Sequence, residues 1–466
     1  MERCLPLFMH SGEAQYHQKL KTSKAPMSPP TSKPSPNARR LITVFCVAGI
    51  TALLGYFYWH TCRRIAGGNL DDFPHFYWAA GAVLHHRDPY LSGTHGYIYP
   101  PLLAYLYMPV AELSPAHAAY AVLPVLILAT LGAVLLASRE SLQRVGAAVN
   151  SFTVCTVAML SLLLIEDKVK GDLQMLQTNS LVLLLFALGL YWLDRSPLLT
   201  GAALGAAFNI KYLSLVMLPY LLLRRRWSTA EWFIAWAVGL ALLPALWSGW
   251  GPNLAQLETA YAGIGRLVGI APVSAPAAET HDLRAGFSLS ILSALARATE
   301  SDGTALVLTA AIALAWIAAG TWIYRRRGIP VLAWPTADEQ REPPYRMMVG
   351  IEYACLVAAA LAFSPQTNSR HLVLVLFPDC MAAAMLLHAR PALRRGAWLT
   401  LCAGTLILLG GLTLPPGNRH GKVFSASTTW LAAGGPCWCL LVMTLTLIAS
   451  GASRSQRRSV GSVGAA

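Results

Sequence analysis

Two adjacent acids, Asp71 and Asp72, stand in the stretch GNLDDFPHFYWAAG, soon after an apolar run. A carboxylate in this place could take the proton from an attacking hydroxyl group. Two carboxylates that share a site disfavour simultaneous ionisation, so one acid could tune the other. The alternative is that the pair only caps a solvated loop. The sequence therefore offers a general base if other reacting groups face the same way.

Three cationic or titratable side chains could hold a phosphate group, namely Lys211, Arg370 and His371. Arginine can bind a phosphate through two parallel hydrogen bonds, whereas lysine acts as a point charge. Lys211 could instead extend from an ordinary membrane span toward the interface. His371 could be an interfacial histidine that is hydrogen-bonded to the backbone.

Five further residues could bind a sugar or an acceptor: Tyr77, Tyr90, Tyr99, Gln177 and Asn179. Tyrosine rings can stack on a sugar, but they are more often packing residues or part of the aromatic belt at a membrane interface. The two amides could bind sugar hydroxyls or cap a helix that begins near residue 179.

Metal ligands are not evident in the sequence. The adjacent histidines His85 and His86 point in different directions, and the CWC at 437–439 is too tightly spaced for a common zinc site. Most of the nine cysteines lie in or beside apolar runs and are expected to be packing residues. We expect no metal and no cofactor.

The composition indicates a membrane protein. Of the 466 residues, 55% are hydrophobic and only 12% are charged, against about 25% charged in soluble domains. The net charge of +14 fits basic cytoplasmic loops and contact with anionic lipid headgroups, and we expect no nucleic-acid partner.

Several apolar runs are long enough to cross a bilayer, so we expect an all-α multi-pass bundle of about 10–12 membrane segments. The candidate spans are 41–59, 119–137, 146–165, 179–193, 198–223, 230–247, 304–324, 348–363, 371–388, 397–414 and 429–449. The first span follows Arg39 and Arg40 late in the chain, so we expect an anchor rather than a cleaved signal peptide.

Basic residues assign the sides of the membrane. We expect an integral protein of the plasma membrane with both termini in the cytoplasm and the candidate site on the non-cytoplasmic side. The expected parts are a disordered arm (1–38), a membrane domain (39–450) with large outer loops at 60–118 and 248–303, and a tail (451–466).

The side assignments conflict at 198–223, because the basic segments at 194–197 and 224–227 both favour the cytoplasm. The residues between them could form a hairpin of two short helices that turns near 208–212. A single long helix would require one assignment to be wrong. Irregular backbone at membrane depth is tolerated only where it is buried in protein or lines a cavity.

The order of short motifs resembles glycosyltransferase family 87. The stretches DDFPHFYWAAGAVLHHRDPY and YIYPPLLAYLYMPVAEL are similar to the family's first outer loop, followed by LQTNSLVLLLF, LTGAALGAAFNIKYLSLVMLP, LRAGFSLSILSALAR and LAFSPQTNSRHLVLVLFP. Together they cover roughly residues 70–380. The family's glycines are absent at two turns, where His86-Arg87-Asp88 and Leu176 stand instead.

The resemblance implies a GT-C type helical bundle with its active site on the non-cytoplasmic face. It also implies inverting transfer of a hexose, commonly mannose, from a polyprenyl-phosphate carrier to a glycolipid or glycan acceptor of the cell envelope. Asp72 occupies the family's position for the general base, with Asp71 as its neighbour or substitute.

Two other classes compete with this interpretation. A transporter or flippase of a lipid-linked sugar should show repeated halves with interrupted helices, and the interruption expected near 208–212 has no evident counterpart in the sequence. A non-catalytic scaffold would not require the polar residues that gather on the outer side.

Overall fold

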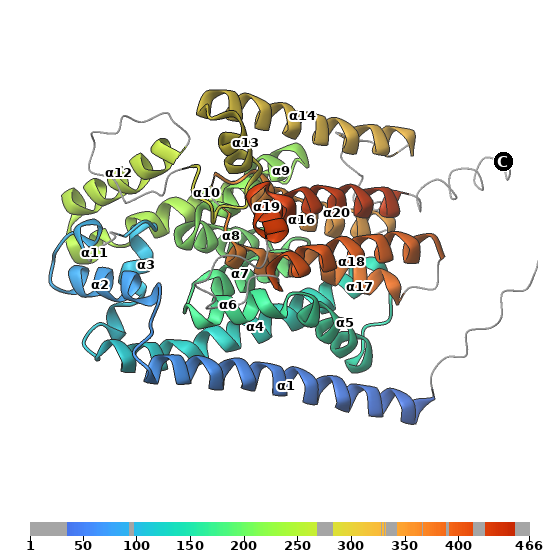
Figure 1. Cartoon of the computed structure of the whole chain (residues 1–466), viewed down its shortest axis with the longest axis horizontal. Helices are drawn as coiled ribbons and strands as arrows, with labels where there is room; N and C mark the ends of the chain where they lie inside the picture. Colours follow the sequence, from blue (N-terminus) through green and yellow to red (C-terminus); the bar gives the residue numbers. More distant parts are fainter. Residues whose placement is uncertain are drawn as a thin grey trace, which may run out of the picture. The chain divides into compact units, whose positions relative to one another are not determined.

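The computed structural model describes residues 35–92, 97–267, 283–327, 329, 331, 343–365, 367–387, 391–412 and 425–452 (Figure 1). All regular structure in these ranges is helical, and they contain no strand. Seven stretches of the described chain are long and apolar enough to span a membrane, which confirms the expected all-α multi-pass class. Nearly all of the predicted arm (1–38) and tail (451–466) lies outside the described residues.

The seven long stretches agree with predicted spans to within several residues. They are α1 (Pro36–Ala66), α4 (Pro115–Val145), α10 (Trp227–Leu242) with α11 (Ala245–Ser248), α14 (Asp302–Arg326), α16 (Pro343–Phe363), the 3₁₀-helix η4 (Ser369–Val375) with α17 (Leu376–Leu386), and α20 (Gly435–Ala452). The predicted span at 397–414 corresponds to α18 (Pro391–Leu412), and a short helix, α19 (Ser425–Ala432), precedes α20.

Shorter apolar helices complete the bundle: α5 (Ser151–Leu164), α7 (Asn179–Trp192), α8 (Pro197–Ile210), and the 3₁₀-helix η3 (Tyr212–Val216) with α9 (Met217–Leu223). Local signals set their ends. The Asn150 side chain forms a reciprocal capping box with Thr153 at the start of α5, and Gly146 ends α4 in the left-handed conformation (φ 74°).

The 198–223 segment is a hairpin. The chain leaves the helical conformation at Lys211 (φ −148°, ψ 135°), and η3 folds back on α8, where the Ser214 hydroxyl donates to the Leu204 carbonyl (2.9 Å). The two ends of the hairpin meet, because the Arg226 guanidinium lies 2.5 Å from Asp194 and 2.6 Å from the Leu193 carbonyl. Both basic segments therefore lie at the same end of this hairpin.

Ion pairs strengthen that end of the bundle. The buried Arg144 of α4 pairs with Asp194 (2.9 Å), and Glu140 pairs with Arg195 (3.0 Å). Glu352 of α16 pairs with Arg224, which directly follows α9. These contacts fix α4, the hairpin and α16 to one another.

The predicted loops carry short helices. The 60–118 segment contains α2 (Phe73–Leu84), η1 (Pro89–Leu91), α3 (Pro101–Leu106) and η2 (Met108–Val110); α6 (Glu166–Gln174) lies between α5 and α7; and the 248–303 segment contains α12 (Trp250–Leu267) and α13 (Ile291–Thr299). The middle of the 248–303 segment, residues 268–282, lies outside the described residues.

Candidate active site

Asp72 lies at the start of α2 and directs its carboxylate away from the helix backbone. It occupies the N-cap position but makes no side-chain capping hydrogen bond. Its Oδ2 atom instead accepts hydrogen bonds from the Arg370 guanidinium and the Gln177 amide. The carboxylate is therefore part of a side-chain cluster and not a loop cap.

Arg370 and His371 are positioned by the first turn of η4. The Asn368 side chain caps this turn by accepting from the backbone N–H groups of Arg370 (3.1 Å) and His371 (3.3 Å). The cap aims Arg370 at Asp72, while Nε2 of His371 lies 3.4 Å from the Lys211 ammonium.

Lys211 sits at the turn of the hairpin, between α8 and η3. Its ammonium group donates to Asn179 Oδ1 (2.6 Å) and to Gln177 Oε1 (3.4 Å). It also lies 5.3 Å from the centre of the Tyr99 ring. Gln177 thus connects Lys211 to Asp72, because its other amide atom donates to that carboxylate.

A second carboxylate, that of Asp172, holds the Asn179 side chain that contacts Lys211. Asp172 of α6 is fully buried and accepts from the Asn179 amide (2.7 Å) and from the Ser180 hydroxyl (2.8 Å). Because Asp172 holds the nitrogen of the Asn179 amide, the amide oxygen is directed at Lys211.

Burial shifts the proton affinities of these groups. Burial lowers the pKa of Lys211 to about 8, with Asp172 opposing the shift and Arg370 adding to it. Burial raises the pKa of Asp172 to about 6, although hydrogen bonds from Ser180 and Asn179 oppose the shift. Burial also raises the pKa of the Tyr99 hydroxyl.

The two turns that lack the family's glycines keep a glycine-like backbone. His86 has φ 54° and Leu176 has φ 51°, both in the left-handed region that glycine adopts without strain. The His86 ring stacks on Trp247 (5.5 Å between centroids), and the Leu176 side chain is buried. A ring contact at His86 and burial of the side chain at Leu176 accompany this conformation.

Some predicted site residues lie outside this cluster. Asp71 has φ 45° and pairs with Arg64, not with the cations of the cluster. The Tyr77 hydroxyl donates to the Leu113 carbonyl (2.7 Å). The Tyr90 hydroxyl donates to the Tyr99 carbonyl (2.8 Å), so Tyr90 supports the backbone of a cluster residue.

Two supporting residues were not among the predicted site residues. Asp172 and Lys168 lie on α6, and Lys168 donates to the Ser369 hydroxyl (3.0 Å) beside Arg370. The signal was present in EDKVKGDLQ, a charged segment directly before the Gln177–Asn179 motif. As for metals, the described residues contain no group of three His, Cys, Asp or Glu side chains that could hold an ion.

A second segment resembles the one that carries Lys211, although it follows a connection between α16 and η4 and interrupts no helix. The segment NIKYLSLVMLP (209–219) resembles NSRHLVLVLFP (368–378), with Lys211 and Arg370 at the same position. Lys211 directly precedes η3, and Arg370 is the second residue of η4. Each of these 3₁₀-helices continues as an α-helix.

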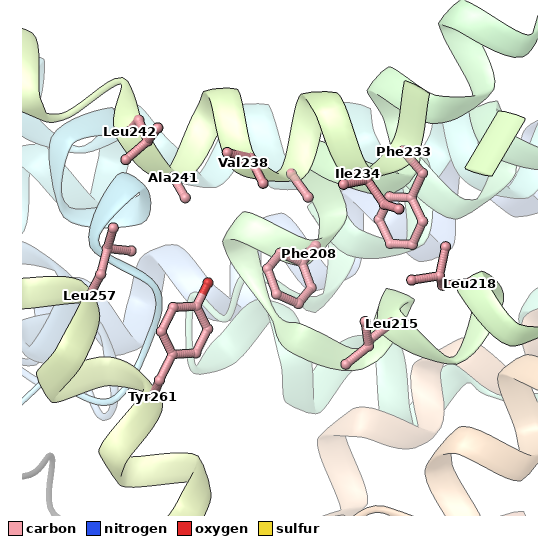
Figure 2. Close-up of a pocket in the computed structure, with 11 residues that line it drawn as sticks. Phe208, Leu215, Leu218, Phe233, Ile234, Val238, Ala241, Leu242, Leu257 and Tyr261 are labelled. Carbon is pink, nitrogen blue, oxygen red and sulfur yellow. The ribbon is translucent and has the colours of Figure 1, made fainter. Parts of the chain in front are cut away.

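An apolar groove of about 300 Å³ adjoins the turn that carries Lys211. Figure 2 shows side chains of α8, η3, α9, α10 and α12 around it, including Phe208, Leu215, Val238 and Tyr261. Leu215 and Val238 are half exposed. The Tyr261 ring contacts Tyr212, the residue after Lys211 (6.0 Å between centroids).

Comparison with known families identifies this arrangement. The sequence model of glycosyltransferase family 87 matches residues 97–337, about half of the chain. The chain belongs to glycosyltransferase family 87. No curated protein matches it.

Family 87 membership and the helical fold make this chain a multi-pass membrane glycosyltransferase, which acts on a sugar donor and an acceptor. The matched range contains Tyr99, Gln177, Asn179 and Lys211. Asp72 lies before the range and Arg370 after it, yet both join the cluster through hydrogen bonds.

Proposed function

We propose that this family 87 enzyme transfers a hexose, with mannose as the first candidate, from a polyprenyl-phosphate carrier to a glycolipid or glycan. The observation that carries the proposal is the contact of Asp72 with Arg370 and, through Gln177, with Lys211. A proton acceptor and two cations thereby meet in one partly open cluster. Such a cluster suits a hydroxyl nucleophile and a phosphate leaving group.

Asp72 is the proposed general base. The acceptor oxygen bonds to the anomeric carbon while the bond from that carbon to the phosphate oxygen breaks. The electron pair of the broken bond stays on the phosphate, and the acceptor proton passes to Asp72. The products are the glycosylated acceptor and a polyprenyl phosphate, and attack opposite the leaving group inverts the anomeric centre.

Lys211, Arg370 and His371 are the proposed phosphate ligands. The leaving phosphate gains negative charge as the bond breaks, so fixed cations favour the transition state over the bound donor. Tyr99, Gln177 and Asn179 line the same cluster and are proposed to contact the sugar. Tyr77, Tyr90 and Asp71 contact groups outside the side-chain cluster and are given no role in the transfer.

The apolar groove supports a lipid-linked donor. The side chains that line it are almost wholly hydrocarbon. Several of these side chains are also exposed on the surface of the helices. A polyprenyl chain in this groove would place its phosphate next to the turn at Lys211. A nucleotide carrier would find no polar walls there.

The charges favour a site on the non-cytoplasmic face. The basic ends of the hairpin, around Arg226, lie opposite to its turn at Lys211. Basic segments favour the cytoplasm, so the turn and the cluster are proposed to face outward. An interrupted helix is a feature of some transporters, but here the turn at Lys211 carries a cation of the cluster.

Donor choice tests the proposal. Purified enzyme in nanodiscs is given radiolabelled mannose on polyprenyl phosphate or on a nucleotide, with a total lipid extract as acceptor. We expect label in glycolipid or glycan products only from the polyprenyl-phosphate donor. Transfer from the nucleotide sugar alone would contradict the proposal.

A further inference from the structure

The base proposed for the reaction is engaged by two other side chains of the cluster. A single oxygen of Asp72, Oδ2, accepts from both Arg370 and Gln177. The Asp72 and Arg370 side chains are 31% and 26% exposed, so substrates can reach both.

Lys211 and Arg370, which stand at the same position of the two similar segments, have different hydrogen-bond partners. Arg370 is bound to a carboxylate, whereas the hydrogen-bond partners of Lys211 among the described residues are two amide oxygens and a histidine nitrogen. A phosphate can therefore approach Lys211 without displacing an anion. At Arg370 the phosphate must compete with Asp72.

We propose that Arg370 exchanges Asp72 for the donor phosphate, so that Asp72 becomes available to the acceptor hydroxyl only when the donor is bound. The inference rests on the proposed function and adds an order to it, with the donor first and the acceptor second. The exchange replaces one partly exposed ion pair by another, so it requires no large free energy. Until the phosphate binds, the Arg370 charge stays paired with Asp72.

The exchange has a consequence that a simple base would not have: removing the Asp72 charge should strengthen phosphate binding. Exposed ion pairs contribute modestly, so we expect Asp72→Asn to bind a short-chain polyprenyl phosphate about two- to five-fold more tightly than wild type. Asp72→Ala, a second variant at the same position, should show the same direction. The dissociation constant is measured by titration calorimetry in detergent on monodisperse protein.

Two controls separate the exchange from a general charge effect. Asp71→Asn removes the neighbouring carboxylate, which pairs with Arg64, and should leave the affinity unchanged. In an Arg370→Gln background, where binding is weaker, adding Asp72→Asn should no longer tighten it. Tightening by Asp71→Asn, or persistent tightening without Arg370, would overturn the exchange.

The outcomes also separate this inference from the proposed function. If Asp72→Asn loses transfer but binds polyprenyl phosphate no more tightly than wild type, the exchange is wrong and the base assignment stands. If neither wild type nor any variant binds polyprenyl phosphate, the proposed donor is wrong and the exchange falls with it.

Discussion

At the scale of the residue, the cluster depends on how Lys211 is held. Its ammonium is partly buried and hydrogen-bonded to neutral amides, while Asp172 holds Asn179 in place and also acts on Lys211 through its charge. Asp72 and Arg370 lie near enough to influence it electrostatically, and His371 contacts it directly. Burial therefore outweighs the nearby carboxylates and lowers the pKa of Lys211 to about 8.

This pKa predicts how donor binding depends on pH. Lys211 is protonated below about pH 8. The affinity for the donor phosphate should therefore be highest there and fall as the pH rises through 8. The donor is a phosphodiester whose charge stays constant in this range. The measurement is kcat/KM for the donor between pH 6.5 and 9.5, and a descending limb is expected.

Lys211→Arg is the matched variant for this prediction. A guanidinium remains protonated throughout the range, so the descending limb should disappear even if the overall activity is lower. An unchanged limb in Lys211→Arg would assign it to another group.

The residue scale also shows what the sequence could predict. The types and order of residues gave Asp72, Lys211, Arg370, His371, Tyr99, Gln177 and Asn179, which the structure brings together. Asp71, Tyr77 and Tyr90 were also predicted but contact other groups. Their directions depend on one backbone angle or one nearby carbonyl, which residue type and spacing do not determine.

At the scale of the element, α8 and α10 form a close helix pair. A Cβ atom at Gly201 would lie 2.6 Å from the backbone carbon of Trp232, and one at Gly205 would lie 2.7 Å from the Trp236 Cβ. Small residues four apart allow membrane helices to approach closely. This contact holds the helix that ends at Lys211.

Gly201→Ala should therefore destabilise the protein. The added methyl group meets backbone atoms that cannot rotate away, and overpacking of this kind costs about 1–3 kcal/mol. The thermal unfolding midpoint in detergent should fall. Gly239→Ala on α10 is the control, because no heavy atom lies within 4 Å of its added Cβ; an equal loss in both variants would contradict the packing account.

The sequence predicted the long membrane helices better than the short helices between them. Hydropathy located the long spans, and the charge conflict at 198–223 indicated a hairpin. The likeness of 368–378 to 209–219 was not predicted, because hydropathy indicates one ordinary span there. The short helices α2, α6 and α13 were also missed, since they are stabilised by packing and not by long apolar runs.

At the scale of the whole molecule, segments far apart in the chain supply one cluster. Asp72 follows the first span, Gln177 and Lys211 come from the matched family range, and Arg370 comes from the start of η4. The similar segments 209–219 and 368–378 each supply one cation to the cluster. Asp72 pairs with Arg370 directly and is linked to Lys211 through Gln177.

The most direct test compares Asp72→Asn with Asp71→Asn in nanodiscs, following label transfer from polyprenyl-phosphate mannose under single-turnover conditions. We predict that Asp71→Asn retains transfer close to wild type, because Asp71 pairs with Arg64 outside the cluster. Asp72→Asn should lose at least about 100-fold in rate, as expected when a general base is removed. Transfer by Asp72→Asn at the wild-type rate would contradict the account and place the base elsewhere.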